Sequence, residues 1–243
     1  MRIFCLATLL VIGLAAAGRA ATVPVPVFAY HRVDAVIPRD RIGSELTVTP
    51  EQLETQLRYL RAHKLRAVTA SDLVDRLARG APVDHLVVLT FDDGYLDART
   101  DALPLLEKYG AKATFYVISH TIGTPNHLAW SDIRELLKDG MEIGAHGADH
   151  LDLSKMTATE QTAQVTRCIA TVARYTGVRP RTYAYPSGQY DAATLDVMRA
   201  AGIDAAFTMR YGLVRSLRRP YEMPRVRINR STAEATFEAA IAP

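Results

Sequence analysis

The sequence predicts an α/β fold, a distorted (β/α) barrel of seven or eight parallel strands in a single domain. Apolar, β-branched segments alternate with amphipathic segments along the chain, as expected for parallel strands joined by helical crossovers. The chain has 243 residues, and single barrels commonly run to about 200–250 residues. An open doubly wound sheet is the alternative, and both architectures place the chemistry at the carboxyl ends of the strands.

The first 20 residues have the features of a secretory signal peptide, which leaves residues 21–243 as the expected domain. Arg2 precedes an apolar run, and the small residues Gly18 and Ala20 stand where a cleavage site needs them. The run is shorter than the roughly 20 residues of a membrane span, although an uncleaved anchor is the alternative. We therefore expect an exported protein, periplasmic or extracellular, without a stable membrane span in its mature part.

Eight segments have the β-branched and aromatic residues expected of strands. In chain order they are residues 26–33, 65–69, 85–91, 112–118, 141–146, 181–186, 203–209 and 223–228. Most neighbouring pairs are separated by enough residues for a helix.

Three of the intervening segments carry the residues that start and stop helices. Thr49 as the N-cap and Pro50 at the first helical position begin a helix over residues 49–63. The expected cap and stop of the other two helices are Ser71 with Gly80 and Ser131 with Gly140.

Charge and cysteine content exclude some partners and cross-links. Loss of the leader lowers Lys+Arg from 29 to 27 against 26 Asp+Glu, so a polyanion such as nucleic acid is not the expected main partner. The basic stretch 210–219 is expected to be a solvated loop, with contact to an anionic envelope polymer as the alternative. Cys168 is the only cysteine after the leader, which rules out an internal disulfide and suggests an inert core thiol in a monomer.

Polar side chains gather where the predicted strands end. Asp92 and Asp93 follow strand 85–91, His146 ends strand 141–146, and His150 comes four residues later. Two imidazoles and one carboxylate form the three-ligand set of a catalytic zinc site. Successive side chains point in different directions, so one aspartate can bind a metal while the other faces the attacking water. The alternatives are histidines that only cap a loop and an Asp93 that caps the following helix.

Three motifs together resemble a known family. TFDDG at 90–94, H-x-x-x-H at 146–150 and a strand ending in Pro-x-Gly at 186–188 are similar, in order, to the polysaccharide deacetylases, carbohydrate esterase family 4, also called the NodB-homology domain. The resemblance implies a metal-dependent hydrolase in which Asp92 is the general base. It also implies a divalent metal, most readily Zn²⁺ with Ni²⁺ or Co²⁺ as alternatives, and its implied ligands are Asp93, His146 and His150.

Two departures from the family pattern point to one branch of it. Ala184 stands where many members have an arginine that orients the base, and no histidine follows His150 to serve as the usual general acid. The segments FAYHRV and AYPSG resemble the deacetylases of poly-β-1,6-N-acetylglucosamine in biofilms, where a first-strand histidine is the acid, a role that falls to His31. Arg225 or Arg227 of the last strand could replace the missing arginine, and a basic outer strand face is the alternative.

The third motif also suggests substrate contacts. The resemblance places the oxyanion donor at the backbone N–H of Ser187, with Tyr185 and Pro186 beside it. Four aromatic side chains could stack on sugar faces or simply pack in the fold, namely Tyr183, Tyr185, Tyr190 and Trp130.

The expected function is the removal of N-acetyl groups from N-acetylglucosamine units of an acetylated extracellular or cell-envelope polysaccharide. Peptidoglycan or chitin-type deacetylation and acetyl-xylan ester hydrolysis are alternatives within the enzymes. A non-catalytic carbohydrate-binding relic of the fold is the alternative of another class, because the usual arginine is missing.

Overall fold

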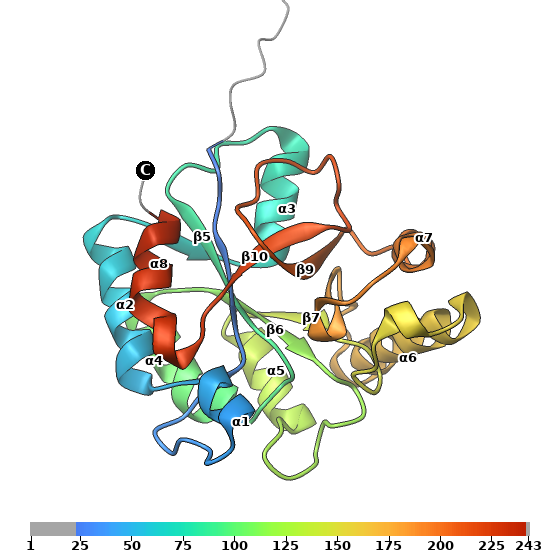
Figure 1. Ribbon diagram of the computed structural model, residues 1–243, viewed down its shortest axis with the longest axis horizontal. Helices are drawn as coiled ribbons and strands as arrows, with labels where there is room; N and C mark the ends of the chain where they lie inside the picture. The colour runs from blue at the N-terminus through green and yellow to red at the C-terminus, as the bar shows by residue number, and fades with distance from the viewer. Residues whose placement is uncertain (1–22, 242–243) are drawn as a thin grey trace, which may run out of the picture.

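The computed structural model describes residues 23–241, so the predicted signal peptide lies outside the described residues (Figure 1). Eight parallel strands form the main sheet, which confirms the predicted α/β barrel. The strands are β1 (Val27–Tyr30), β4 (Arg66–Val68), β5 (Leu86–Phe91), β6 (Ala113–Val117), β7 (Glu142–Ala145), β8 (Thr182–Ala184), β9 (Ala205–Tyr211) and β10 (Met223–Arg227).

Seven of these strands close into a ring, and β4 is the source of its distortion. β1 pairs with both β10 and β5, which closes the sheet. β4 pairs with Leu86–Val88 of β5, whereas β6 pairs with the rest of that strand, Leu89–Phe91. The amide of Lys112, just before β6, donates to the carbonyl of Ala67 in β4 (3.2 Å). β4 is therefore wedged between the first halves of β5 and β6 instead of running the full height of the barrel.

The first predicted strand is divided at His31, which corrects the expectation of one strand over 26–33. β1 ends at Tyr30, and the chain then leaves the barrel as β2 (Arg32–Val33). β2 pairs in parallel with β3 (Thr47–Val48) to form a separate two-stranded sheet. His31 consequently lies in the break between two short strands, at the carboxyl end of the barrel.

The helices surround the barrel, as Figure 1 shows. They are α1 (Arg41–Leu46), α2 (Pro50–Ala62), α3 (Ala70–Arg79), α4 (Leu103–Tyr109), α5 (Trp130–Lys138), α6 (Ala158–Thr176), α7 (Ala192–Ala200) and α8 (Ala233–Ile241). Short helical turns add η1 (Ala98–Ala102), η2 (Leu153–Lys155), η3 (Pro186–Gly188) and η4 (Arg230–Thr232). Within residues 23–241, none of the helices is both long and apolar enough to cross a membrane.

Helix α2 begins as predicted, whereas two other caps are corrected. Thr49 and Gln52 form a capping box, with Pro50 in the first turn. Thr69 caps α3 instead of Ser71, since the Thr69 hydroxyl accepts from the amide of Asp72 (3.2 Å), while the hydroxyl and amide of Ser71 both donate to Glu142 (2.7 and 2.8 Å). Helix α5 starts at Trp130, one residue before the expected cap Ser131.

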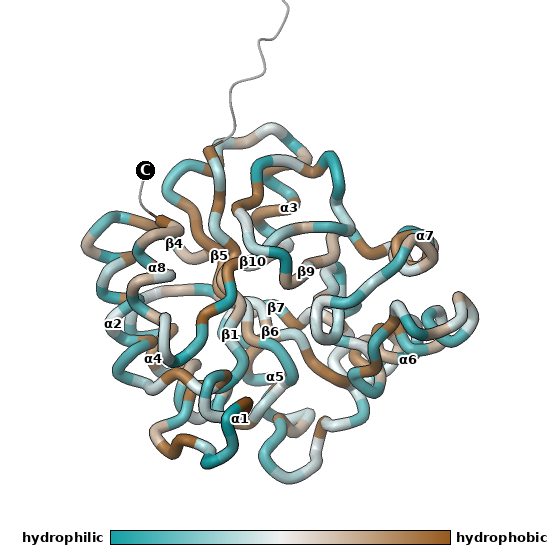
Figure 2. The backbone as a smooth tube through the Cα atoms, in the orientation of Figure 1, coloured by the Kyte–Doolittle hydropathy of each residue, from teal (hydrophilic) through white to brown (hydrophobic). Residues whose placement is uncertain are grey.

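The core lies inside the barrel and between the barrel and its helices. Apolar residues concentrate on the central strands, while the outer turns are more hydrophilic (Figure 2). All six residues of β5 are buried, so its carboxyl end presents a rigid edge to the rim. Cys168 is buried in α6, as predicted, and burial raises its pKa to about 11, which suits an inert thiol.

Candidate active site

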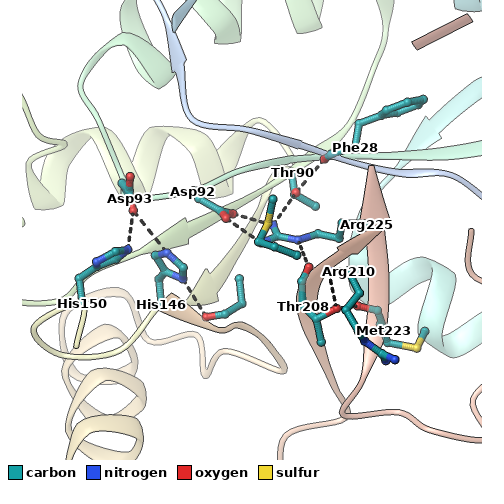
Figure 3. A network of polar contacts seen from close by, with 12 residues as sticks. Phe28, Thr90, Asp92, Asp93, His146, His150, Thr208, Arg210, Met223 and Arg225 are labelled. Atoms are coloured by element: carbon teal, nitrogen blue, oxygen red, sulfur yellow. Dashed lines mark hydrogen bonds and ion pairs between the residues drawn. The ribbon is translucent and has the colours of Figure 1, made fainter. Parts of the chain in front are cut away.

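Strand β5 delivers two adjacent aspartates to the rim and sends them in different directions. The amide of Asp92 donates to the carbonyl of Tyr30 in β1 (2.9 Å), which fixes the end of β5 against β1. Asp93 then has a left-handed backbone (φ 72°), as does Gly94 (φ 73°), and this turns the chain sharply. Asp92 therefore faces Arg225 in the barrel, whereas Asp93 faces the two histidines (Figure 3).

Asp93, His146 and His150 form a cluster that could hold a metal ion, since their candidate ligand atoms all lie within 4.8 Å of one another. Asp93 Oδ1 is 3.3 Å from Nε2 of each histidine. This oxygen is buried, and within residues 23–241 it has no hydrogen bond of good geometry. A buried, unpaired carboxylate oxygen between two imidazole nitrogens fits a bound cation, because each of the three offers it a lone pair.

A backbone contact orients His146 toward this cluster. Its Nδ1 lies 2.7 Å from the carbonyl oxygen of Ala184. A carbonyl only accepts, so Nδ1 carries a hydrogen, and in the neutral ring Nε2 keeps its lone pair directed at Asp93. Ala184 stands where the usual arginine is missing, and its carbonyl therefore supports the metal cluster.

The ionisation of the three side chains is coupled. Burial raises the pKa of Asp93, but the close contact with His146 and the charge of that ring when protonated outweigh burial and hold the pKa well below its usual range. Burial lowers the pKa of His146, but Asp93 and Asp92 outweigh burial and raise it. Burial and the neighbouring His146 lower the pKa of His150. The cluster attracts positive charge, which either protons or a metal ion can supply.

The loop between the two histidines is anchored to helix α6 through Asp149. The amide of Asp149 donates to Gln164 Oε1 (3.0 Å), and Gln164 Nε2 donates to Asp149 Oδ2 (2.7 Å). Arg167 and His120 also contact the Asp149 carboxylate. Positive φ at Gly147 (80°) and His150 (55°) makes the segment a tight turn. This anchor was not predicted from the sequence, where its only signal is the aspartate between the two histidines.

Arg225 of β10 reaches Asp92 across β1, the strand that lies between β10 and β5. Nη1 and Nη2 donate to the two carboxylate oxygens, both at 2.8 Å. The guanidinium also donates to the carbonyl of Thr208 (3.0 Å) and to the hydroxyl of Thr90 (3.1 Å). Arg225 is fully buried, whereas the alternative Arg227 is exposed. The structure therefore places Arg225, and not Arg227, against Asp92 (Figure 3).

This pair determines the charge of Asp92. Burial raises the pKa of Asp92, but the positive charge and hydrogen bonds of Arg225 outweigh burial and leave the pKa below its ordinary value. Asp92 is therefore ionised at neutral pH and able to accept a proton.

His31 emerges from the rim next to Asp92, since Tyr30 and Phe91 are register partners in β1 and β5. Its Nδ1 is buried and has no hydrogen-bond partner in the described part of the chain. Burial lowers the pKa of His31, although the charges of Asp92 and Asp93 partly oppose this. The ring is therefore mainly neutral at neutral pH.

The third motif forms a tight turn after β8 and does not present its aromatic side chain at the surface. Ser187 is exposed, with a left-handed backbone (φ 53°) in the turn after β8. Tyr185 is fully buried, and its hydroxyl donates to the carbonyl of Tyr221 (2.9 Å), so its side chain does not reach the rim. Pro186 is also buried.

The other three aromatic side chains considered for sugar stacking make packing contacts within the fold. Tyr183 is fully buried, and Tyr190 stacks on Tyr185 with ring centroids 4.9 Å apart. Trp130 stacks on Tyr175 (4.5 Å). Packing within the fold, one of the two interpretations of these aromatics, accounts for these contacts.

Comparison with known proteins supports the family suggested by the three motifs. A family model described as polysaccharide deacetylase matches residues 79–206, just over half of the chain. The match includes Asp92, Asp93, His146, His150 and Ser187. His31 and Arg225 lie outside it.

Two relatives and one solved structure align with most of the chain. YxkH of Bacillus subtilis is 28% identical over 89% of this chain and 75% of its own length. The poly-β-1,6-N-acetyl-D-glucosamine N-deacetylase of Staphylococcus aureus is 25% identical over 75% of this chain and 68% of its own. The structure of IcaB from Ammonifex degensii superposes with a TM-score of 0.80 at 27% identity, covering 90% of this chain and 97% of that one. From its motifs, barrel and family match, the chain belongs to the polysaccharide deacetylases, carbohydrate esterase family 4.

Proposed function

We propose that this protein is an exported, metal-dependent N-deacetylase acting on N-acetylglucosamine units of an extracellular or cell-envelope polysaccharide of the poly-β-1,6-linked type. The observation that carries the proposal is the site itself. A three-ligand cluster of Asp93, His146 and His150 stands beside an ionised Asp92 and next to His31. The name of the Staphylococcus aureus relative supports the choice of polymer.

The cluster suits zinc among the divalent metals, because two imidazoles and one carboxylate are the usual three protein ligands of a catalytic zinc. A divalent metal held there would polarise the acetyl carbonyl and activate the attacking water. The coupled charges of Asp93 and His146 favour exchange of a proton for the metal when it binds.

The remaining chemistry falls to the chain's own side chains and backbone. Asp92, held by Arg225, accepts a proton from the water that attacks the carbonyl carbon. The N–H of Ser187 donates to the oxygen on which negative charge develops.

Cleavage of the C–N bond then needs a proton on the leaving nitrogen. His31 supplies this proton, and the products are acetate and a free amine. Because burial lowers the pKa of His31, the ring is mainly neutral at rest and takes a proton from solvent before it donates one, favoured by the neighbouring charges of Asp92 and Asp93. An amide has a poor leaving group, so this step separates N-deacetylation from the easier hydrolysis of esters.

The test is acetate release from acetylated oligosaccharides by the purified protein. We expect release from β-1,6-linked N-acetylglucosamine oligomers, its loss with a chelator, and its recovery with added Zn²⁺. Chitin oligomers, peptidoglycan and acetylated xylan form the comparison panel. Faster release from one of these would reassign the substrate, and no chelator-sensitive release from any of them would disprove the enzymatic proposal.

A further inference from the structure

We propose that Asp97 is a positioning residue for His31, an inference that rests on the proton-donor role in the proposed function. Asp97 follows the Asp92-Asp93 pair and stands immediately before η1. An aspartate at this position usually caps the helix with its side chain. In residues 23–241 Asp97 makes no such capping bond, and its carboxylate is directed to β2 instead.

Asp97 holds the two residues that follow His31. Its Oδ1 accepts a hydrogen bond from the amide of Val33 (3.0 Å), and its Oδ2 accepts one from Nε of Arg32 (3.0 Å). The carboxylate is well protected, since only 6% of the Asp97 side chain is exposed. Charge-assisted bonds of this kind in a buried setting are stronger than their exposed counterparts.

His31 therefore lies between two anchors that belong to the same segment of chain. On one side, the amide of Asp92 donates to the carbonyl of Tyr30. On the other side, the carboxylate of Asp97 binds Val33. Both anchors come from the turn that carries the proposed base and one proposed metal ligand, so this turn sets the position of the proton donor as well.

The backbone anchors matter because the His31 ring lacks a support of its own. Catalytic histidines are commonly oriented by a hydrogen bond to the nitrogen that does not react. Nδ1 of His31 is buried without such a bond in the part of the chain that the structure describes. The direction of the ring is consequently decided by the backbone of residues 30–33, and Asp97 fixes one end of that segment.

The experiment compares an amide with an ester substrate. p-Nitrophenyl acetate releases a stable anion and needs no proton donor, whereas acetylated glucosamine oligomers do. We expect Asp97→Ala to lower kcat on the amide by about 10–100-fold with little change in KM, and to alter ester hydrolysis by less than about threefold. His31→Ala should show the same split with a larger amide loss. The double variant should be no slower than His31→Ala alone.

Two further variants separate a positioning role of Asp97 from a general disturbance of the structure around it. Asp34→Ala is the matched control, because it removes the other carboxylate bound to Arg32 (3.1 Å) and leaves both Asp97 bonds in place, so activity should be unchanged. Arg32→Gln removes one of the two Asp97 bonds from a partly exposed side chain and should give a smaller loss with the same split. If Asp97→Ala does not fold, Arg32→Gln carries the test alone.

The outcomes distinguish this inference from the proposed function. Equal losses on amide and ester, or an additive loss in the double variant, would overturn the role of Asp97 while leaving His31 as the donor. The absence of a split in His31→Ala itself would overturn the proton-donor role and the inference together. Metal content and melting temperature, measured on each variant, identify any loss that comes from the metal cluster.

Discussion

At the residue scale, the two neighbouring carboxylates of Asp92 and Asp93 have different partners. Asp92 is paired with a buried guanidinium, whereas Asp93 stands between two imidazoles. Two adjacent buried charges of the same sign would otherwise repel each other and raise a pKa. Each instead has its own positive partner, and both pKa values lie below the ordinary value.

Substitution of each aspartate by asparagine should therefore have different effects. Asp93→Asn removes a charged ligand and should weaken metal binding. Asp92→Asn should retain the metal but lower kcat by at least about 100-fold, because the proton acceptor is lost. Metal content and steady-state rates measured on the same samples test this. Equal loss of metal in both variants would contradict the separate roles.

Arg225 should set the acidic limb of the pH profile. Arg225→Gln leaves the burial of Asp92 but removes the charge that offsets it, so the pKa of Asp92 rises. Because the base must be deprotonated, the fall in kcat/KM on acidification should begin at a higher pH than in the wild type. Breaking a buried ion pair also costs about 3–5 kcal/mol of stability, so profiles are compared below the melting temperature of the variant. An acidic limb at the same pH in the variant and the wild type would contradict the proposal that Arg225 lowers the pKa of the base Asp92.

At the scale of elements, the site depends on contacts between loops and the helices behind them. Asp149 ties the histidine loop to α6 through two hydrogen bonds with Gln164. The loop also holds His150 in a left-handed backbone conformation (φ 55°), which is costly for a residue other than glycine. The helix therefore supports the candidate metal cluster without contributing one of its three side chains.

Gln164→Ala should lower metal affinity by up to about 10-fold, less than the loss of a partner bonded directly to a ligand, because Gln164 holds Asp149 and not a ligand itself. Arg167→Ala is the matched control, because it removes an exposed contact to the same carboxylate. Exposed ion pairs contribute at most about 1 kcal/mol, so this variant should bind metal nearly as well as the wild type. Titration with Zn²⁺ against a competing chelator measures both affinities. Equal affinities in the two variants would rule out the anchor.

At the scale of the whole molecule, the metal cluster links stability to pH and to metal. Because the folded pKa values of Asp92 and Asp93 are depressed, their stabilising contribution is present above the unfolded value of about 4 and is lost as pH falls below it. Metal binding adds stability only to the folded state, by about 2.7 kcal/mol at 100 times Kd.

Thermal melts of the chelator-treated protein should therefore show a higher melting temperature on addition of Zn²⁺. The melting temperature of the same sample should fall on acidification below about pH 4. Asp93→Asn should lose most of the response to metal, since it lacks one ligand. A metal-induced rise of the same size in Asp93→Asn would place the stabilising ion somewhere other than this cluster.

Much of the fold could be predicted because strands and helix ends have characteristic patterns within short segments of sequence. The apolar run of β5 and the capping box of α2 are properties of short segments, and both are found where the sequence places them. The N-cap expected at Ser71 is wrong because its surroundings depend on a distant part of the chain. Its hydroxyl was free to cap a helix in the sequence, but Glu142, 71 residues away, takes it in the folded protein.

The sequence by itself determined the barrel, the family motifs and the list of candidate side chains, because strand periodicity and short motifs are local. Tertiary structure decided between Arg225 and Arg227, which share one face of an ideal strand. A register irregularity between Met223 and Arg225 accompanies the burial of one and the exposure of the other. The tertiary structure also breaks the first predicted strand at His31 and brings the side chain of Asp97 to β2. These outcomes depend on contacts across some 65 to 135 residues, which no local pattern encodes.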